Sequence, residues 1–288
     1  MAIHHSYKIL GNGIVEVDSG VPGKVVGIVC NVHGNEPCGR RAVQRILKSH
    51  AIKTGRLVLI EGNPEAHLIS RRFVDTDMNR VFTYETLTSD SQNQDLARAR
   101  YLTQVIPELG LDLAIDFHSV SSETAHPFTV CFKEAVELAS LCMTPVIHGW
   151  EGIVVGSLCE WMCKIDIPTV VVEAGLHEAV EAVDQAERTL HSILSHHALI
   201  ELDQPIEMPG FAEFDVLENV TIKDTKTFKL AKSYASFEKV EANQLFGTDK
   251  TGEYRIPAGD DYFLMMPSTQ ENIDSGITSS AYYLMKQR

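Results

Sequence analysis

Five short apolar runs, separated by longer segments with helical spacing, most constrain the fold of this chain. They occupy residues 24–32, 56–63, 111–119, 127–132 and 167–175 and are rich in Val and Ile. Because their apolar residues follow one another without polar alternation, each run is typical of a strand buried on both faces, as in a parallel sheet. The intervening segments predict helices over residues 37–49, 92–108, 135–143 and 181–194. This alternation predicts an α/β fold, with a mixed, mainly parallel sheet flanked by helices.

The pattern changes near residue 205. Beyond it the chain shows short alternating segments separated by turn residues, and helical periodicity is weak. We therefore predict an α/β domain over residues 1–204 and a small β-rich C-terminal domain over residues 205–288.

Charge and composition exclude several classes of partner. The net charge of -14 disfavours nucleic-acid binding, which needs a basic face. No apolar run approaches the ~20 residues of a membrane helix, and the first ten residues lack the charged-then-apolar pattern of a signal peptide. The six cysteines form no C-x-x-C pair, and several lie in apolar runs, as buried reduced thiols do. We predict a cytoplasmic protein that binds neither nucleic acid nor membrane. Whether it forms a homo-oligomer is left open by the sequence.

Three of the predicted strands end in or beside an ionisable residue. His33 follows the first, His118 lies at the end of the 111–119 run, and Glu173 lies at the end of the 167–175 run. Because ligands of open α/β sheets bind at the carboxyl ends of the strands, these side chains are expected to meet at one edge.

The residue types at this edge suit a metal. Catalytic zinc takes three His or Glu ligands and keeps one position open. His33 and Glu36, three residues apart across a strand end and a helix start, can reach one ion, and His118 supplies the third ligand. Asp116, two residues earlier on the same strand face, either accepts an imidazole N–H or has a plain structural role. Each residue alone could equally be an ordinary polar group at a strand end.

Other motifs are less specific. The segment "SRRFVDTDMNRVF" (70–82) mixes arginines and aspartates with large apolar residues, which indicates a partly buried loop that holds its arginines through Asp75 or Asp77. The alternative is a solvated turn with incidental ion pairs. The segment "HEAVE" (177–181) fails the H-E-x-x-H zinc motif, and G-x-S-x-G, Walker A and G-x-G-x-x-G are absent from the sequence.

Taken in order, several segments resemble one known family. They are "HGNEP" (33–37), "GNPEA" (62–66), "RRFVDTDMNRVF" (71–82), "DFHS" (116–119) and "VEAG" (172–175). Together they resemble the succinylglutamate desuccinylase/aspartoacylase family, zinc enzymes with a carboxypeptidase-like fold. The resemblance implies a zinc-carboxypeptidase-like sheet and a β-rich C-terminal domain that narrows the entry to the site.

The resemblance also implies roles for matching residues. His33, Glu36 and His118 correspond to the three ligands of one Zn²⁺ per chain, and Glu173 corresponds to the general base that activates a zinc-bound water. The implied activity is hydrolysis of the amide bond of a small, anionic N-acyl amino acid, such as N-acetylaspartate or N-succinylglutamate.

Substrate contacts follow from the same resemblance. Arg72 matches an arginine that contacts the scissile carbonyl, and Asn79 with Arg80 matches a pair that holds the substrate carboxylate. Lys164 and Tyr282 are the candidates for binding a second acid group of the substrate. The segment after Glu173 follows neither named enzyme, so the acyl group and the amino acid stay open.

Two other functions compete with this one. A metallocarboxypeptidase that removes a C-terminal residue from a peptide could use the same site. A non-catalytic binding protein on the same scaffold would be expected to have lost a ligand or the base, whereas all four residues are present.

Overall fold

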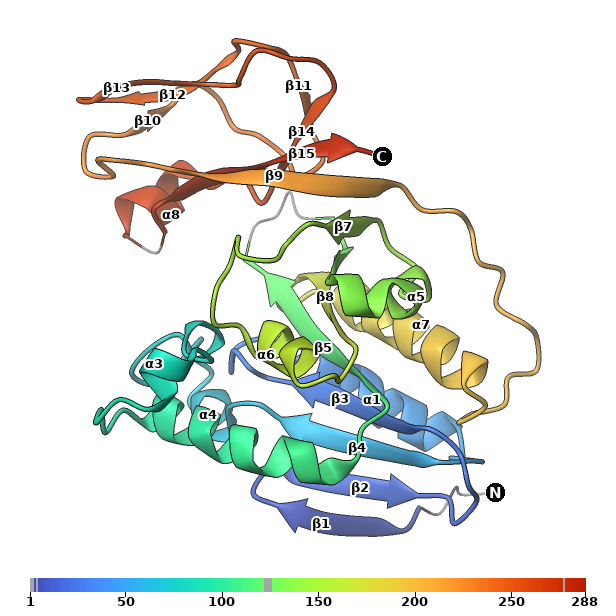
Figure 1. The fold of residues 1–288 in the computed structure, drawn as a ribbon. Coiled ribbons are helices and arrows are strands. Elements are labelled where there is room, and N and C mark those ends of the chain that lie inside the picture. The colour runs from blue at the N-terminus through green and yellow to red at the C-terminus, as the bar shows by residue number, and fades with distance from the viewer. Residues whose placement is uncertain (1–2, 4, 122–125, 277) are drawn as a thin grey trace.

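The computed structural model describes residues 3, 5–121, 126–276 and 278–288, and its centre is the expected α/β sandwich (Figure 1). Residues 1, 2 and 4, in the segment searched for a signal peptide, lie outside this description. Within the described part, twelve strands form one sheet. In spatial order they are β1 (Tyr7–Gly11), β2 (Ile14–Asp18), β4 (Arg56–Glu61), β3 (Val25–Cys30), β5 (Leu113–Val120), β8 (Thr169–Leu176), β6 (Phe128–Cys131), β7 (Val146–His148), β9 (Glu213–Thr221), β15 (Ser280–Gln287), β14 (Tyr262–Met265) and β11 (Lys239–Val240).

The middle of this sheet is parallel, as the continuous apolar runs predict. Strand β3 pairs in parallel with β4 and β5, and β5 pairs in parallel with β8. Strand β6 is the exception among the five runs, because it pairs antiparallel with β8. Only residues 121–127 separate β5 from β6, and a parallel crossover needs a dozen or more residues. The N-terminal hairpin β1–β2 and its antiparallel pairing with β4 were not predicted.

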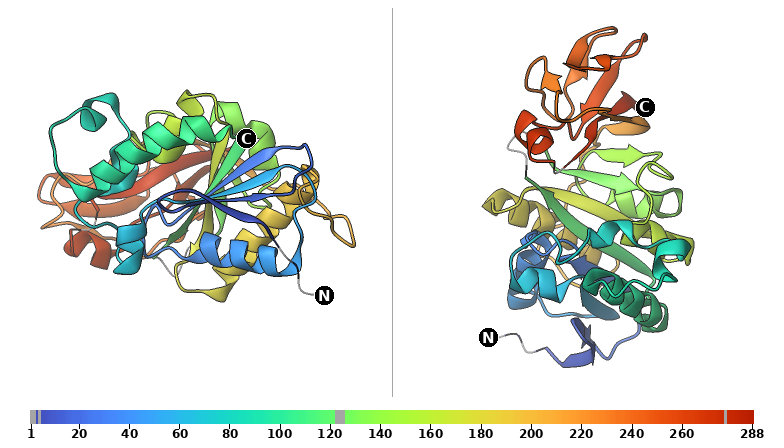
Figure 2. Two further views of the ribbon diagram at one scale, coloured as in Figure 1. Left: turned by 90° about the horizontal axis from the view of Figure 1, so that it is seen from below. Right: turned by 90° about the vertical axis from the view of Figure 1, so that its left-hand side faces the viewer.

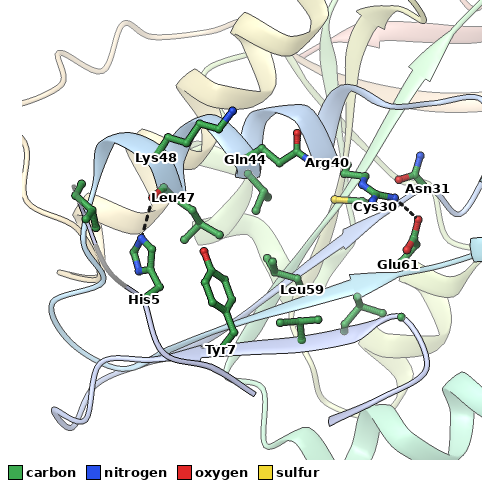
Figure 3. Close-up of a pocket in the computed structure, with 15 residues that line it drawn as sticks. His5, Tyr7, Cys30, Asn31, Arg40, Gln44, Leu47, Lys48, Leu59 and Glu61 are labelled. Atoms are coloured by element: carbon green, nitrogen blue, oxygen red, sulfur yellow. Dashed lines mark hydrogen bonds and ion pairs between the residues drawn. The ribbon is translucent and has the colours of Figure 1, made fainter. Parts of the chain in front are cut away.

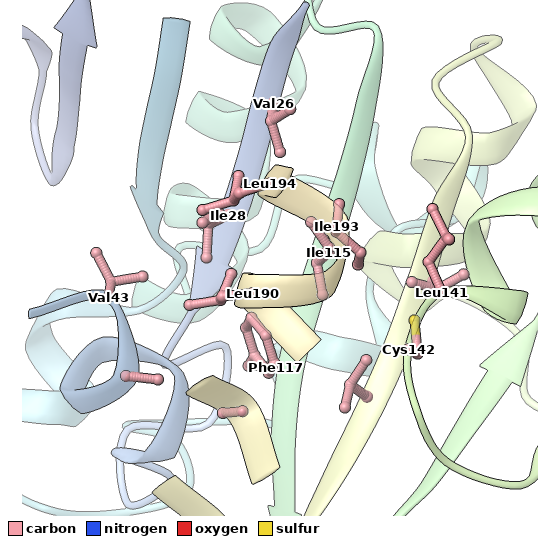
Figure 4. Packing of buried hydrophobic residues seen from close by; sticks show 14 of the residues in the cluster. Val26, Ile28, Val43, Ile115, Phe117, Leu141, Cys142, Leu190, Ile193 and Leu194 are labelled. Carbon is pink, nitrogen blue, oxygen red and sulfur yellow. The ribbon is translucent and has the colours of Figure 1, made fainter. Parts of the chain in front are cut away.

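Helices cover both faces of the central strands (Figure 2). On one face, alternate strand residues such as Ile28 and Phe117 pack against α1 (Cys38–Ser49), α5 (Val136–Ser140) and α7 (Val180–His196), as Figure 4 shows for α1 and α7. On the other face, Val29 and Ala114 pack with α4 (Gln94–Val105) and α6 (Leu158–Lys164). Burial on both faces is the reason why these strands lack polar alternation. The remaining helices are α2 (Pro64–Leu68), α3 (Tyr84–Leu87), α8 (Gln270–Asp274) and the 3₁₀ turns η1 (Met78–Arg80), η2 (Ile106–Leu109) and η3 (Lys133–Ala135).

The C-terminal part is built from antiparallel strands. Strand β15 pairs with β9 and with β14, and β14 pairs with β11. A separate three-stranded sheet contains β10 (Lys229–Leu230), β12 (Leu245–Asp249) and β13 (Gly252–Arg255). Because β9 also pairs in parallel with β7, the C-terminal strands extend the main sheet; the domain division at residues 204/205 stays a proposal from the sequence. None of the helices in the described residues is long and apolar enough to cross a membrane.

Candidate metal centre and active site

The turn after β3 places His33 and Glu36 at the carboxyl edge of the sheet. Asn31 adopts a left-handed conformation (φ 56°) that turns the chain out of the strand, and its Nδ2 donates to the carbonyl of Glu36 (3.1 Å). Gly34 passes so close to helix α2 that a Cβ there would lie 2.1 Å from the carbonyl carbon of Ala66. Only glycine fits this approach, so the H-G-N-E turn is shaped by its contact with α2.

Strand β5 brings His118 to the same place. One ligand atom each from His33, Glu36 and His118 lies within 4.8 Å of the others, and all three residues are buried. The two carboxylate oxygens of Glu36 lie 2.9 Å from His33 Nδ1 and 2.9 Å from His118 Nδ1. The two Nδ1 atoms are 3.1 Å apart. Two imidazole nitrogens and a carboxylate therefore converge on one point.

The outer nitrogen of each imidazole faces an aspartate. His33 Nε2 lies 3.1 Å from Asp77 Oδ1, and His118 Nε2 lies 3.2 Å from Asp116 Oδ2. The hydrogen bond to Asp77 favours the His33 tautomer that carries its proton on Nε2, which leaves the Nδ1 lone pair facing the centre. Because two imidazole nitrogens and a carboxylate meet at one buried point, the residues fit a cation such as Zn²⁺, whose binding would displace any proton held there.

The charges of the group agree with this geometry. Burial favours the neutral acid of Glu36, but the adjacent imidazoles of His33 and His118 outweigh it and hold its pKa well below the usual range. Burial lowers the pKa of His118, but the carboxylates of Asp116 and Glu36 outweigh it and raise that pKa well above its usual value. Asp77 is only partly buried, and its bond to His33 and the nearby arginines hold its pKa well below the usual range.

Strand β8 places Glu173 beside His33, Glu36 and His118, which together are called the metal-type group below. In the sheet register, Glu173 lies directly opposite His118 on β5 and opposite Phe128 on β6. Its Oε2 is buried and has no hydrogen-bond partner among the described residues. Burial and the negative charge of Glu36 raise the pKa of Glu173, and the positive charge of His118 lowers it. The net effect is a pKa of about 8. A carboxylate with a pKa near neutrality is suited to taking up and giving back a proton.

The loop between α2 and η1 brings the arginines to the site, as the sequence predicts for a partly buried loop. Arg72 donates through Nη2 to Asp77 Oδ2 (2.9 Å), and its Nη1 lies 3.6 Å from Glu36 Oε1. Asn79 is buried and accepts a bond from the backbone N–H of Leu158 at the start of α6 (2.9 Å). Asp77, rather than Asp75, is thus the aspartate that holds an arginine.

A cavity of about 170 Å³ joins these groups. It is lined by the metal-type group, Arg72, Asn79, Arg80 and Glu173, together with apolar side chains from β6, β8, the 150–157 segment and the C-terminal strands. The sequence-predicted groups therefore face one space, whose far side is formed by Met266 and Tyr283.

Comparisons with known proteins agree with the order of motifs and with the fold. A sequence model described as the succinylglutamate desuccinylase/aspartoacylase catalytic domain matches residues 22–148. A probable aspartoacylase of Parasynechococcus marenigrum (strain WH8102) is 31% identical over 170 residues, which cover 53% of this chain and 55% of the relative. A succinylglutamate desuccinylase of Idiomarina loihiensis is 33% identical over 97 residues, 32% of this chain and 28% of the relative. These matches show that the chain is similar, over residues 22–148, to the succinylglutamate desuccinylase/aspartoacylase catalytic domain.

Solved structures show the same fold as this chain. A succinylglutamate desuccinylase from Vibrio parahaemolyticus superimposes with a TM-score of 0.76 at 16% identity, covering 100% of this chain and 92% of the other. Murine aminoacylase 3 gives a TM-score of 0.70 at 17% identity, covering 93% and 96%. The chain spans about half the length of the curated relatives it matches in sequence, so the comparisons show the fold and a similarity to this family but not a substrate.

Two residues proposed for substrate recognition lie outside the lining of this cavity. Lys164, at the end of α6, has a largely exposed side chain that pairs with Glu160 one helical turn earlier (2.8 Å). Tyr282 is fully buried against Phe246 in the C-terminal cluster. Its neighbour Tyr283 lines the cavity instead, because successive residues of a strand point to opposite faces.

Sequence reasoning missed a histidine that does line the cavity. His177 was set aside with the failed H-E-x-x-H motif, yet its Nδ1 lies 2.8 Å from the hydroxyl of Ser119. Ser119 in turn donates its backbone N–H to Glu36 Oε2 (3.1 Å). The useful signal was the position of His177 four residues after Glu173, at the same strand end.

The loop that carries Arg72 depends on a buried aspartate that no motif indicated. Asp95, in the first turn of α4, is completely buried. Its carboxylate accepts bonds from three successive backbone amides of residues 74–76 and from Asn63 Nδ2. This carboxylate connects α4, the "GNPEA" segment and the arginine loop.

A larger cavity, of about 720 Å³, lies between α1 and the N-terminal strands (Figure 3). Its wall is mainly apolar; its charged residues are Lys48 and the pair Arg40 and Glu61, which bond to each other (2.7 Å). Among the described residues, the group able to hold a metal lies in the smaller cavity, so we place the chemistry there.

Proposed function

We propose that this protein is a zinc-dependent amidohydrolase that cleaves the amide bond of a small N-acyl amino acid. One observation carries the proposal: Glu173 lies opposite His118 in the sheet register, with a buried oxygen that has no partner among the described residues, beside the His33/Glu36/His118 group. A metal site and a proton acceptor in one small cavity are the two parts that amide hydrolysis requires.

The chain's own residues have separate tasks in this proposal. Glu173 takes a proton from the attacking water at Oε2 and passes it to the departing amine. Arg72 donates N–H groups to the oxygen on which negative charge develops. Asn79 and Arg80 hold the α-carboxylate of the amino acid, which fixes the amide over the site.

The metal would be held by His33 Nδ1, Glu36 and His118 Nδ1. When bound, Zn²⁺ supplies a Lewis acid that polarises a carbonyl and lowers the pKa of a water molecule toward ~7. Asp77, through its hydrogen bond to Nε2, orients His33 for this role. The six free, buried cysteines support our assignment of the protein to a reducing compartment such as the cytoplasm.

Metal analysis and an activity screen test the proposal together. We expect about one zinc per chain and chelator-sensitive release of amino acid from N-acetyl, N-succinyl or N-formyl amino acids. His33→Ala should remove both zinc and activity, whereas His196→Ala, at an exposed position on α7, should remove neither. Faster cleavage of blocked dipeptides than of N-acyl amino acids would instead identify a carboxypeptidase. A protein that binds no zinc and gains no activity with added zinc would reject the proposal.

A further inference from the structure

On the side of Glu173 that faces away from His118, the wall of the cavity is apolar. The register places Phe128 directly opposite Glu173, and two pairs away it places Val130 opposite Val171. All three apolar side chains are buried and line the cavity. Glu173 therefore separates a polar half, which contains the metal-type group, from a hydrophobic half.

Aromatic residues from outside the α/β core complete this hydrophobic half. Trp150 and Tyr283 lie with ring centroids 4.9 Å apart, and each side chain is more than nine-tenths buried. Val154 and Phe132 also line the cavity. A surface of this kind binds apolar groups through removal of water from both partners.

Fixed positive charge in the cavity is limited. Among the described lining residues, the arginines are Arg72 and Arg80, and none is a lysine. Arg72 is engaged by Asp77 and lies near Glu36. Arg80 is therefore the cation left for a substrate carboxylate, and a second carboxylate would lie unpaired in the hydrophobic half, where an unpaired charge is costly.

The position of Tyr283 shows where the side chain of a bound amino acid would lie. Tyr283 lines the same cavity as Arg80 and Glu173. The α-carbon of an amino acid carries its carboxylate and its nitrogen on adjacent bonds. With the carboxylate at Arg80 and the nitrogen at Glu173, we place the side chain of the amino acid toward the apolar lining residues, which include Tyr283, Phe128 and Val171.

We propose that the preferred substrates are N-acyl amino acids with a neutral, apolar side chain of about leucine or methionine size, rather than N-acyl derivatives of aspartate or glutamate. This inference rests on the proposed amidohydrolase function and assigns its substrate class. The cavity volume of about 170 Å³ sets an upper limit on the size of this side chain, because the same space must also hold the amide.

The test compares kcat/KM of the zinc-loaded protein for N-acetyl-L-leucine, N-acetyl-L-methionine, N-acetyl-L-aspartate and N-acetyl-L-glutamate. We expect the two apolar substrates to be preferred by at least about 100-fold. Val154→Arg, which adds a cation to the apolar wall from a loop, should reduce the leucine-to-aspartate ratio at least about tenfold. The matched control is Val155→Arg, at an exposed neighbouring position outside the lining, and it should leave the ratio unchanged. Val154→Gln, with melting temperature and zinc content measured for every variant, separates a local charge effect from misfolding.

Each result bears on one claim. Hydrolysis of the acidic substrates at rates equal to or above the apolar ones overturns the substrate class and leaves the amidohydrolase function intact. If no substrate is hydrolysed, the proposed function fails. Calorimetric titration of the zinc-loaded protein with N-acetyl-L-leucine and N-acetyl-L-aspartate then tests whether the cavity prefers an apolar side chain. Tighter binding of the leucine derivative supports the apolar pocket, and equal or weaker binding overturns it.

Discussion

Replacing Glu173 by glutamine should abolish turnover and at the same time stabilise the metal-free protein at alkaline pH. The pKa of Glu173 is about 8, compared with 4.5 for an ordinary glutamate. Each pH unit between these values corresponds to about 1.36 kcal/mol, so ionising Glu173 costs the folded chain up to about 5 kcal/mol. Because the side chain retains some exposure to water, we expect roughly half of this, about 2–3 kcal/mol.

The sign of the effect follows from proton binding. Between pH 4.5 and 8 the folded metal-free chain holds a proton on Glu173 that the unfolded chain has released, so the stability contributed by the neutral acid is lost as the pH rises through this window. Glutamine stays neutral and avoids that loss. At 2–4 °C per kcal/mol, Glu173→Gln should melt roughly 5–10 °C higher than wild type at pH 9 and at nearly the same temperature at pH 4.5.

The assay combines melting curves of chelator-treated protein at pH 4.5 and 9 with kcat of the zinc-loaded protein. Turnover should fall by about 10²–10⁴, with zinc content preserved because Glu173 is outside the ligand set. The control is Glu178→Gln, a largely exposed carboxylate a few residues further on, which should change neither quantity appreciably. Near-normal turnover in Glu173→Gln, or a melting temperature at pH 9 no higher than wild type, would refute the reasoning.

Three further substitutions test how the site is held. Gly34→Ala forces a Cβ against the backbone of Ala66, so melting temperature and zinc content should both fall, whereas Gly210→Ala, which has open space around it, should be neutral. Asp95→Ala leaves the amides of the arginine loop unpaired and should cost about 2–4 kcal/mol in urea unfolding, with a drop in kcat/KM; an unchanged unfolding midpoint would contradict the anchoring role. Arg72→Lys should lower kcat by about 10²–10³ with little change in KM, and a pure KM effect would show that Arg72 acts in binding only.

The separation of strand faces explains which parts of the site were predictable. His33, Glu36, His118 and Glu173 could be placed together from sequence because each lies at or next to the end of a long apolar run, and the ends of parallel strands share one edge. Tyr282 and Tyr283 could not be distinguished in this way. A shift of one residue exchanges the two faces of a strand, and the bulged pairing of β15 with β9 decides which tyrosine faces the cavity.

The amino-acid sequence by itself determined the class of fold and the chemical groups at the sheet edge. Continuous apolar runs can be satisfied only by burial on two faces, and the types and spacing of the polar residues that follow them limit the chemistry. Tertiary structure decided the rest: the antiparallel direction of β6, the anchoring by Asp95, the return of His177 to the site and the apolar wall beyond Glu173. These depend on contacts between segments far apart in the chain, whose register and direction no local pattern specifies.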